Sequence, residues 1–182
     1  MIYDIKICKN GEVAPYKTTV DISEENGRVR FFFTADQSGC YCPYDEYNKL
    51  HSDGDACEIL IGCDTERKAY YEMEVSAKGA LMLAKIVNHG PGDDGVPVIE
   101  THFIEDCFFA GKAEKTASGY TAAFTFDKKC IAPNGERIYF NAYRLETDGG
   151  EQTKKHLFAL SPTMRPRFHF PEYFPWLDEY VK

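Results

Sequence analysis

The chain has 182 residues, enough for one domain with a hydrophobic core, and we expect a single domain over residues 1–182. Asp and Glu outnumber Lys and Arg by 29 to 21, and the net charge of −8 argues against nucleic acid or an anionic membrane as the main partner. No apolar run reaches the length of a membrane span, and the aromatic content of 14% favours strands.

The N-terminal part of the chain predicts short strands separated by turns. Residues 2–8 (IYDIKIC) favour an opening strand, and residues 28–36 (RVRFFFTAD) favour a strand with little solvent on either side. The first residues lack the apolar core of a secretion signal, and the seven Cys have no disulfide-framework spacing. We therefore expect a reduced, cytoplasmic protein, or an extracellular one if a leader has been removed.

Residues 37–53 form a loop that is rich in Tyr, Gly and polar residues. Rigid aromatic side chains on a loop are good contact groups, which makes Tyr44 and Tyr47 candidate binding residues. The alternative is that they cover the edge of a sheet.

Residues 54–79 predict a central antiparallel hairpin, because two runs with a period of two flank a short polar loop. One face is apolar, and the opposite face carries Glu58, Glu72 and Glu74. Three carboxylates on one sheet face repel each other unless water, a base, a metal or a polyol ligand offsets the repulsion. They also suit the acid and base of a glycosidase-like hydrolase, which is the main alternative from another functional class.

The remaining chain predicts further short strands near residues 80–87, 98–103, 108–116, 120–127, 137–146 and 156–161. Turn signals separate them, no long amphipathic helix appears, and residues 162–176 hold four Pro. The sequence therefore predicts an all-β fold, an antiparallel β-sandwich of the jelly-roll type with little helix.

Three elements in order resemble the family 9 carbohydrate-binding modules and their solitary relatives. They are residues 54–61 (GDACEILI), residues 70–79 (YYEMEVSAKG), and a C-terminal pair formed by residues 141–144 (NAYR) and 161–174 (SPT followed by FHFPEYF). The resemblance covers roughly residues 29–177 and implies a β-sandwich that binds a mono- or oligosaccharide without chemistry.

The resemblance also implies which residues bind the sugar. Glu58 matches the family's hydroxyl-binding Glu, Phe168 stands where one of two clamp aromatics would be, and Arg165 stands near an expected Asn. The other clamp position, near Ser52, is not aromatic, and the family's Arg falls at about Glu72, which inverts its charge. A scaffold that has kept the fold and lost its sugar is therefore a further alternative.

Other polar residues complete the candidate sugar site. Asn141, Arg144 and His169 could contact hydroxyls, although Arg144 could instead form a structural ion pair with Glu58, and His169 more often has a structural role. Ca²⁺ is a possible ion at Asp53 and Asp55, because Asp-Gly loops offer oxygen ligands and the resembling family often carries calcium. A haem site using Met73 lacks an obvious His partner, and the oligomeric state is open.

Overall fold

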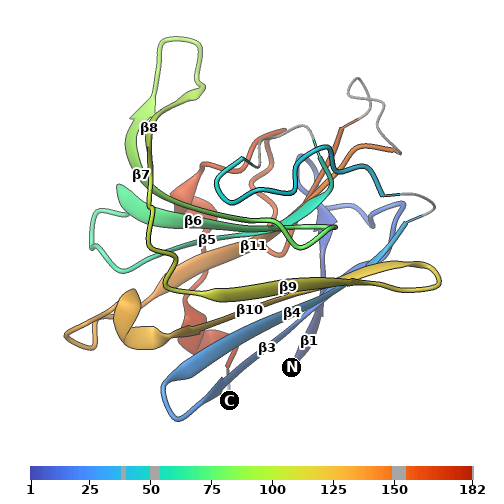
Figure 1. Ribbon diagram of the computed structural model, residues 1–182. Coiled ribbons are helices and arrows are strands. Elements are labelled where there is room, and N and C mark those ends of the chain that lie inside the picture. Colours follow the sequence, from blue (N-terminus) through green and yellow to red (C-terminus); the bar gives the residue numbers. More distant parts are fainter. Residues whose placement is uncertain (38–39, 50–53, 149–154, 182) are drawn as a thin grey trace.

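Two antiparallel sheets stack on each other, as Figure 1 shows for the computed structural model, which describes residues 1–37, 40–49, 54–148 and 155–181. The five-stranded sheet has the order β1 (Ile2–Asp4), β3 (Thr18–Glu25), β4 (Arg28–Asp36), β10 (Gly119–Asp127) and β9 (Ala110–Lys115). The seven-stranded sheet has the order β2 (Lys6–Ile7), β12 (His156–Ala159), β11 (Tyr139–Glu146), β5 (Ala56–Gly62), β6 (Ala69–Ser76), β7 (Leu81–Pro91) and β8 (Pro97–Phe103). The predicted all-β antiparallel sandwich is confirmed.

Helical structure in the described part of the chain is limited to short 3-10 turns, namely η1 (Lys128–Cys130), η3 (Pro171–Tyr173) and η4 (Leu177–Glu179). No helix among these residues has the length and apolar character needed to cross a bilayer.

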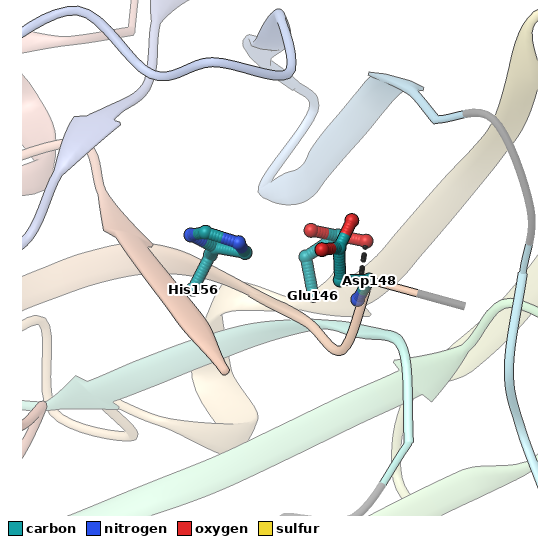
Figure 2. A group of neighbouring side chains, drawn as sticks. All are labelled: Glu146, Asp148 and His156. Carbon is teal, nitrogen blue, oxygen red and sulfur yellow. Dashed lines mark hydrogen bonds between the residues drawn. The ribbon is translucent and has the colours of Figure 1, made fainter. Parts of the chain in front are cut away.

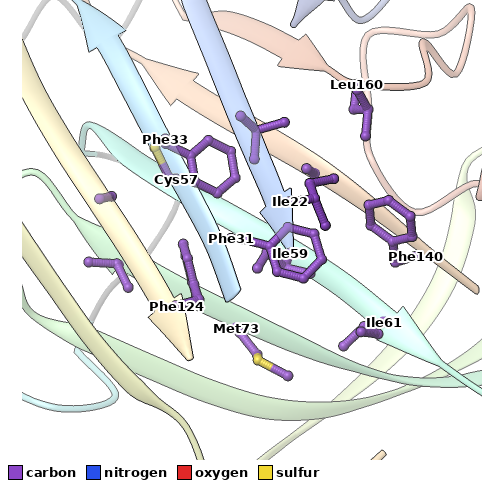
Figure 3. Close-up of a cluster of buried hydrophobic side chains, with 14 of the residues drawn as sticks. Ile22, Phe31, Phe33, Cys57, Ile59, Ile61, Met73, Phe124, Phe140 and Leu160 are labelled. Atoms are coloured by element: carbon purple, nitrogen blue, oxygen red, sulfur yellow. The ribbon is translucent and has the colours of Figure 1, made fainter. Parts of the chain in front are cut away.

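The main core lies between the two sheets and consists largely of alternate residues from their central strands (Figure 3). On β5, Cys57, Ile59 and Ile61 point into it, as the alternation predicts. Phe31 from the five-stranded sheet meets Phe140 from the seven-stranded sheet edge to face, with 5.4 Å between ring centroids. This contact joins the layers across the sandwich.

A second apolar cluster lies on the outer face of the seven-stranded sheet, where the C-terminal segment (residues 161–176) crosses the strands. Phe168 and Phe174 from this segment pack on strand residues that include Tyr143. Arg67, in the turn between β5 and β6, donates through Nη1 to the carbonyl oxygens of Pro171 and Phe174. Both faces of the central strands are thus covered, which explains why every residue of β5 is buried.

The N-terminus corrects one expectation. Residues 2–8 are not a single strand, because β1 pairs with β3 in one sheet and β2 pairs with β12 in the other. Ile5 lies between them and is buried in the main core. The chain therefore passes from one layer to the other at this point.

Candidate functional site

Three carboxylates meet on the outer face of the seven-stranded sheet. Glu58 on β5 lies directly opposite Glu74 on β6, and Glu72 shares their face two residues away. One carboxylate oxygen from each residue lies within 4.8 Å of the others. The predicted common face of the three residues is confirmed.

These carboxylates line a cavity of about 380 Å³, which we call the acidic pocket. Its other walls come from the start of β5, the β7–β8 region, β11 and β12, and the C-terminal segment, and they comprise Ala56, Val96, Pro97, Ile99, Leu145, Leu157, Pro166, Arg167, Phe168 and His169. The volume lies in the range of small-molecule sites, and mostly apolar walls with a few convergent polar groups are typical of such sites.

The aromatic wall of the acidic pocket is held from behind. The ring of Phe168 stacks on Tyr143, with 4.2 Å between centroids. The Tyr143 hydroxyl donates to the carbonyl oxygen of Phe168 and accepts a hydrogen bond from Asn141 Nδ2. Asn141 is fully buried and also bonds the backbone of Ser161, so it orients the wall through Tyr143 and does not line the pocket.

Burial and mutual repulsion dominate the electrostatics of the acidic pocket. Burial raises the pKa of Glu58 well above its usual range, and the negative charges of Glu72 and Glu74 raise it further. Burial and the charge of Glu72 likewise raise the pKa of Glu74, and burial raises the pKa of Glu72 to about 7. Oε1 of Glu58 is buried and has no hydrogen-bond partner in the part of the chain that the structure describes.

His169 lies at the edge of the acidic pocket and stays neutral near pH 7. Burial lowers its pKa to about 4, and Nδ1 shares a hydrogen bond with the Tyr70 hydroxyl at 3.0 Å. Its carbonyl oxygen accepts from Asn88 Nδ2. These bonds fix the C-terminal segment on the sheet while the ring remains part of the pocket wall.

Arg144 lies on the opposite face of the sheet from Glu58, which corrects its assignment to the site. Its register partner is Cys57, a core residue, and its guanidinium bonds Thr18 Oγ1, the carbonyl oxygen of Asp36 and Gln37 Oε1. The possible ion pair with Glu58 does not form for the same reason. Arg144 joins the two sheets instead of touching the acidic pocket.

Asp55 also has a structural role. It is fully buried, and its carboxylate accepts hydrogen bonds from Gln37 Nε2, the Tyr41 amide, and both the amide and the hydroxyl of Thr147. Because these donors already occupy the carboxylate, Asp55 is poorly placed to bind Ca²⁺. Asp53, its predicted partner, lies outside the described residues.

The other candidate residues lie away from the acidic pocket. The Tyr47 hydroxyl donates to the carbonyl oxygen of Ile104, and its ring packs against the main core. Tyr44 is not among the pocket residues, and Arg165 is exposed, with its guanidinium 6.0 Å from the Phe170 ring centroid. Of the candidate sugar-binding residues, the structure brings Glu58, Phe168 and His169 together.

A second polar cluster could hold a metal ion. Glu146 at the end of β11 pairs directly with His156 on β12, and Asp148 follows two residues after Glu146. Figure 2 shows the two carboxylates beside each other, with the His156 ring on the neighbouring strand. One possible ligand atom from each residue lies within 4.8 Å of the others. This set mixes oxygen and nitrogen donors.

Sequence reasoning missed the wall that the β7–β8 region and the neighbouring loop provide. Val96 and Pro97 lie between the strands predicted near residues 80–87 and 98–103, where no periodicity predicts the direction of a side chain. Arg167 was also missed, since it lies in the Pro-rich segment where no regular element predicts a side-chain direction.

Comparison with known proteins finds similar structures but no similar sequence. No model of a protein family matches this chain, and no curated protein matches it in sequence. A candidate carbohydrate-binding protein from Bacteroides uniformis ATCC 8492 is similar in structure, with a TM-score of 0.73 at 11% identity over 97% of this chain and 84% of that chain.

A family 9 carbohydrate-binding module from Caldicellulosiruptor kristjanssonii is also similar, in complexes with glucose and with cellotriose. The TM-scores are 0.56 and 0.57 at 11% identity, over 99% of this chain and 83% and 82% of the respective module chains. The chain therefore has a fold like that of the family 9 modules.

Proposed function

We propose that this protein binds a carbohydrate, non-catalytically, in the acidic pocket. The observation that carries the proposal is the meeting of a buried carboxylate cluster with the Phe168 wall in one cavity of sugar size. A sugar presents hydroxyl groups, which need polar acceptors, and C–H faces, which need an apolar surface. The fold shared with sugar-binding modules supports the same function.

Each residue of the acidic pocket has a separate role in the proposed sugar binding. Glu58 accepts hydrogen bonds from sugar hydroxyls through Oε1, which has no other partner among the described residues. Phe168 supplies the apolar face for the ring, and the stacked Tyr143 behind it limits its movement. His169, being neutral, offers a polar edge without adding charge.

Isothermal titration calorimetry with a panel of mono- and oligosaccharides tests the proposal. We expect binding by the native chain, with a loss of about tenfold or more for Glu58→Gln and for Phe168→Ala. The matched controls are Glu114→Gln and Phe32→Ala, both on the five-stranded sheet, and they should bind like the native chain. Glu58→Gln removes a charge without removing volume, so it remains informative if Phe168→Ala fails to fold.

The outcomes separate the remaining candidates. Absence of binding across the panel would leave a scaffold without a sugar ligand. Release of aryl alcohol from aryl glycosides, abolished by Glu58→Gln or Glu72→Gln, would support the hydrolase instead. We favour binding because the three carboxylates contact one another on one side of the cavity, whereas a glycosidase places two carboxyl groups on either side of the scissile bond.

A further inference from the structure

The acidic pocket brings three carboxyl groups together, and no base among the described residues lies beside them to compensate a negative charge. Among the described residues, the side chains that shift the pKa of Glu58, Glu72 or Glu74 are all acidic groups, and none is a Lys or an Arg. Arg167 lines the cavity, but its side chain is exposed to water, which screens its charge. The described residues therefore supply no water-shielded positive charge that would balance the carboxylates of the pocket.

One of these carboxylate oxygens, Oε1 of Glu58, is buried and has no hydrogen-bond partner among the described residues. Glu58 is 5% exposed and its Oε1 makes no hydrogen bond, although a buried carboxylate oxygen costs free energy when it has no donor. Glu74 is 8% exposed and lies directly opposite Glu58 across the β5–β6 pair. A ligand that brings a positive charge and several donors would satisfy both carboxylates at once.

We propose that the acidic pocket prefers a sugar with a protonated amine, a hexosamine or its oligomer, over a neutral sugar. This inference rests on the proposed function and names its substrate class. The ammonium group offers three N–H donors, which matches a cluster of three carboxylates. An ammonium group bonded to a carboxylate is charged on both the donor and the acceptor side and adds a Coulomb attraction, so a neutral hydroxyl in the same place gains less.

The walls of the pocket argue for an organic cation over a bare metal ion. Phe168, Ile99 and Leu157 line the cavity together with the carboxylates, and its volume is about 380 Å³. A metal ion would use the carboxylates and leave these apolar side chains without a ligand surface to cover. An amino sugar uses both parts, since its ring covers the aromatic wall while its ammonium group reaches the carboxylates.

The other groups that face the cluster do not oppose this preference. His169 is neutral near pH 7, because burial lowers its pKa to about 4. Burial also raises the pKa of the hydroxyls of Tyr70 and Tyr143 and of the Cys8 thiol, so these groups remain uncharged. An incoming ammonium group thus meets carboxylates and neutral groups.

Calorimetry with three sugars of the same ring tests the amine directly. The sugars are glucosamine, N-acetylglucosamine and glucose, at pH 7 and low salt, where only the first carries a charge. We expect glucosamine to bind at least tenfold more tightly than the other two. Glu74→Gln should reduce that ratio severalfold, and the surface control Glu114→Gln should leave it unchanged.

Each other result is decisive. Equal affinity for glucosamine and glucose would overturn the amine preference and leave sugar binding intact. No binding of any sugar, in this trio or in the wider panel, would remove the proposed function and the preference together. Calcium chloride that competes with glucosamine for Glu58 and Glu74, without any sugar preference, would assign the cluster to a metal.

A separate observation supports a second site, at Glu146, Asp148 and His156 (Figure 2). Glu146 is fully buried, its Oε1 accepts from the Asp148 amide, and its Oε2 has no hydrogen-bond partner among the described residues. The Tyr16 hydroxyl donates to Oδ1 of Asp148. Arg144 lies near Glu146, but its guanidinium is already bound to the opposite sheet.

We infer that this cluster binds a divalent transition metal ion such as Zn²⁺. Two carboxylates and one imidazole match the ligand preferences of zinc, whereas Ca²⁺ takes oxygen ligands. His156 and Glu146 are direct register partners, so the β11–β12 pairing presets their separation. This site lies on a different element pair from the β5–β6 carboxylates and does not depend on the sugar.

Titration of Zn²⁺ into EDTA-treated protein, with exposed thiols alkylated beforehand, tests the second site. We expect one equivalent to bind, with at least tenfold weaker binding in His156→Gln and in Glu146→Gln. The control is His102→Gln, an exposed His beside Glu100 on β8. Loss of binding in this control alone, or unchanged binding in His156→Gln, would overturn the assignment.

Discussion

Replacement of Glu72 by Gln tests the electrostatics of the acidic pocket without any ligand. The substitution keeps the shape of the side chain and removes its ability to ionise. Burial raises the pKa of Glu72 from 4.5 to about 7 in the folded chain. Because the folded state holds the proton more tightly than the unfolded state, this group stabilises the fold at low pH and loses that effect as the pH rises through 7.

The size of the effect follows from the shift. One pKa unit corresponds to 1.36 kcal/mol, so Glu72 lowers the free energy of unfolding, relative to a side chain that does not titrate, by about 1 kcal/mol at pH 5 and by about 3 kcal/mol at pH 8. Gln carries no such cost at either pH. The stability gained by Glu72→Gln should therefore grow by about 2 kcal/mol between pH 5 and pH 8.

Urea denaturation followed by circular dichroism at pH 5, 6, 7 and 8 measures this difference. The comparison of variant with native chain at each pH cancels the titrating groups away from Glu72, whereas Glu58 and Glu74, whose pKa the charge of Glu72 raises, add to the gain in the variant. Glu114→Gln is the matched control, because Glu114 is exposed on β9 and its pKa is lowered by Lys112. Its stability should follow that of the native chain within about 0.5 kcal/mol.

Two results would refute the reasoning. A stability difference between Glu72→Gln and the native chain that stays constant from pH 5 to pH 8 would mean that the carboxyl titrates alike in both states. A variant that is less stable at pH 8 would mean that the charge of Glu72 stabilises the fold, through a partner that the structure does not show.

Further predictions concern stability and use the same urea assay. Arg144→Met should cost about 3–5 kcal/mol, since it leaves the acceptors that join the sheets unpaired; a cost below 1 kcal/mol would contradict this role. Asp55→Asn should cost about 3 kcal/mol, because charge-assisted bonds to Gln37 and Thr147 weaken, and native stability would contradict that. His169→Gln should remove up to about 3 kcal/mol of the stability that the native chain loses between pH 6.5 and pH 4, because the native His stays neutral only in the folded state. An equal loss of stability on acidification in the variant and the native chain would argue against the burial of His169.

Alternation along the chain was enough to predict the face that carries the carboxylates. Glu58, Glu72 and Glu74 occupy positions whose neighbours are apolar, and a period of two leaves only one arrangement of a hairpin with a buried face. The same rule places Arg144 with Phe140 on the core side of β11. The need of a sugar site for polar contacts to hydroxyls suggested a site role for Arg144, and the strand geometry contradicts it.

The walls of the acidic pocket could not be predicted in the same way. Phe168 and Arg167 belong to an irregular Pro-rich segment, whose path depends on distant partners such as Arg67 and Tyr143. Val96 comes from the turn between β7 and β8. Contacts between segments far apart in sequence decide these positions, and no local pattern encodes them.

Some buried charged groups of the seven-stranded sheet have protein partners and others have none, and this contrast is the strongest argument for a ligand. On the inner side, Asp55 and both terminal nitrogens of Arg144 have protein partners, whereas the buried Oε2 of Glu146, in the proposed metal cluster, has none among the described residues. On the outer side, Glu58, Glu72 and Glu74 are brought together without a counter-charge, at a cost in stability near neutral pH. A chain that satisfies buried ions elsewhere in the same sheet has the means to satisfy these as well. Local conflicts of this kind are expected where function requires them, so the missing counter-charge is the part that we expect the ligand to supply.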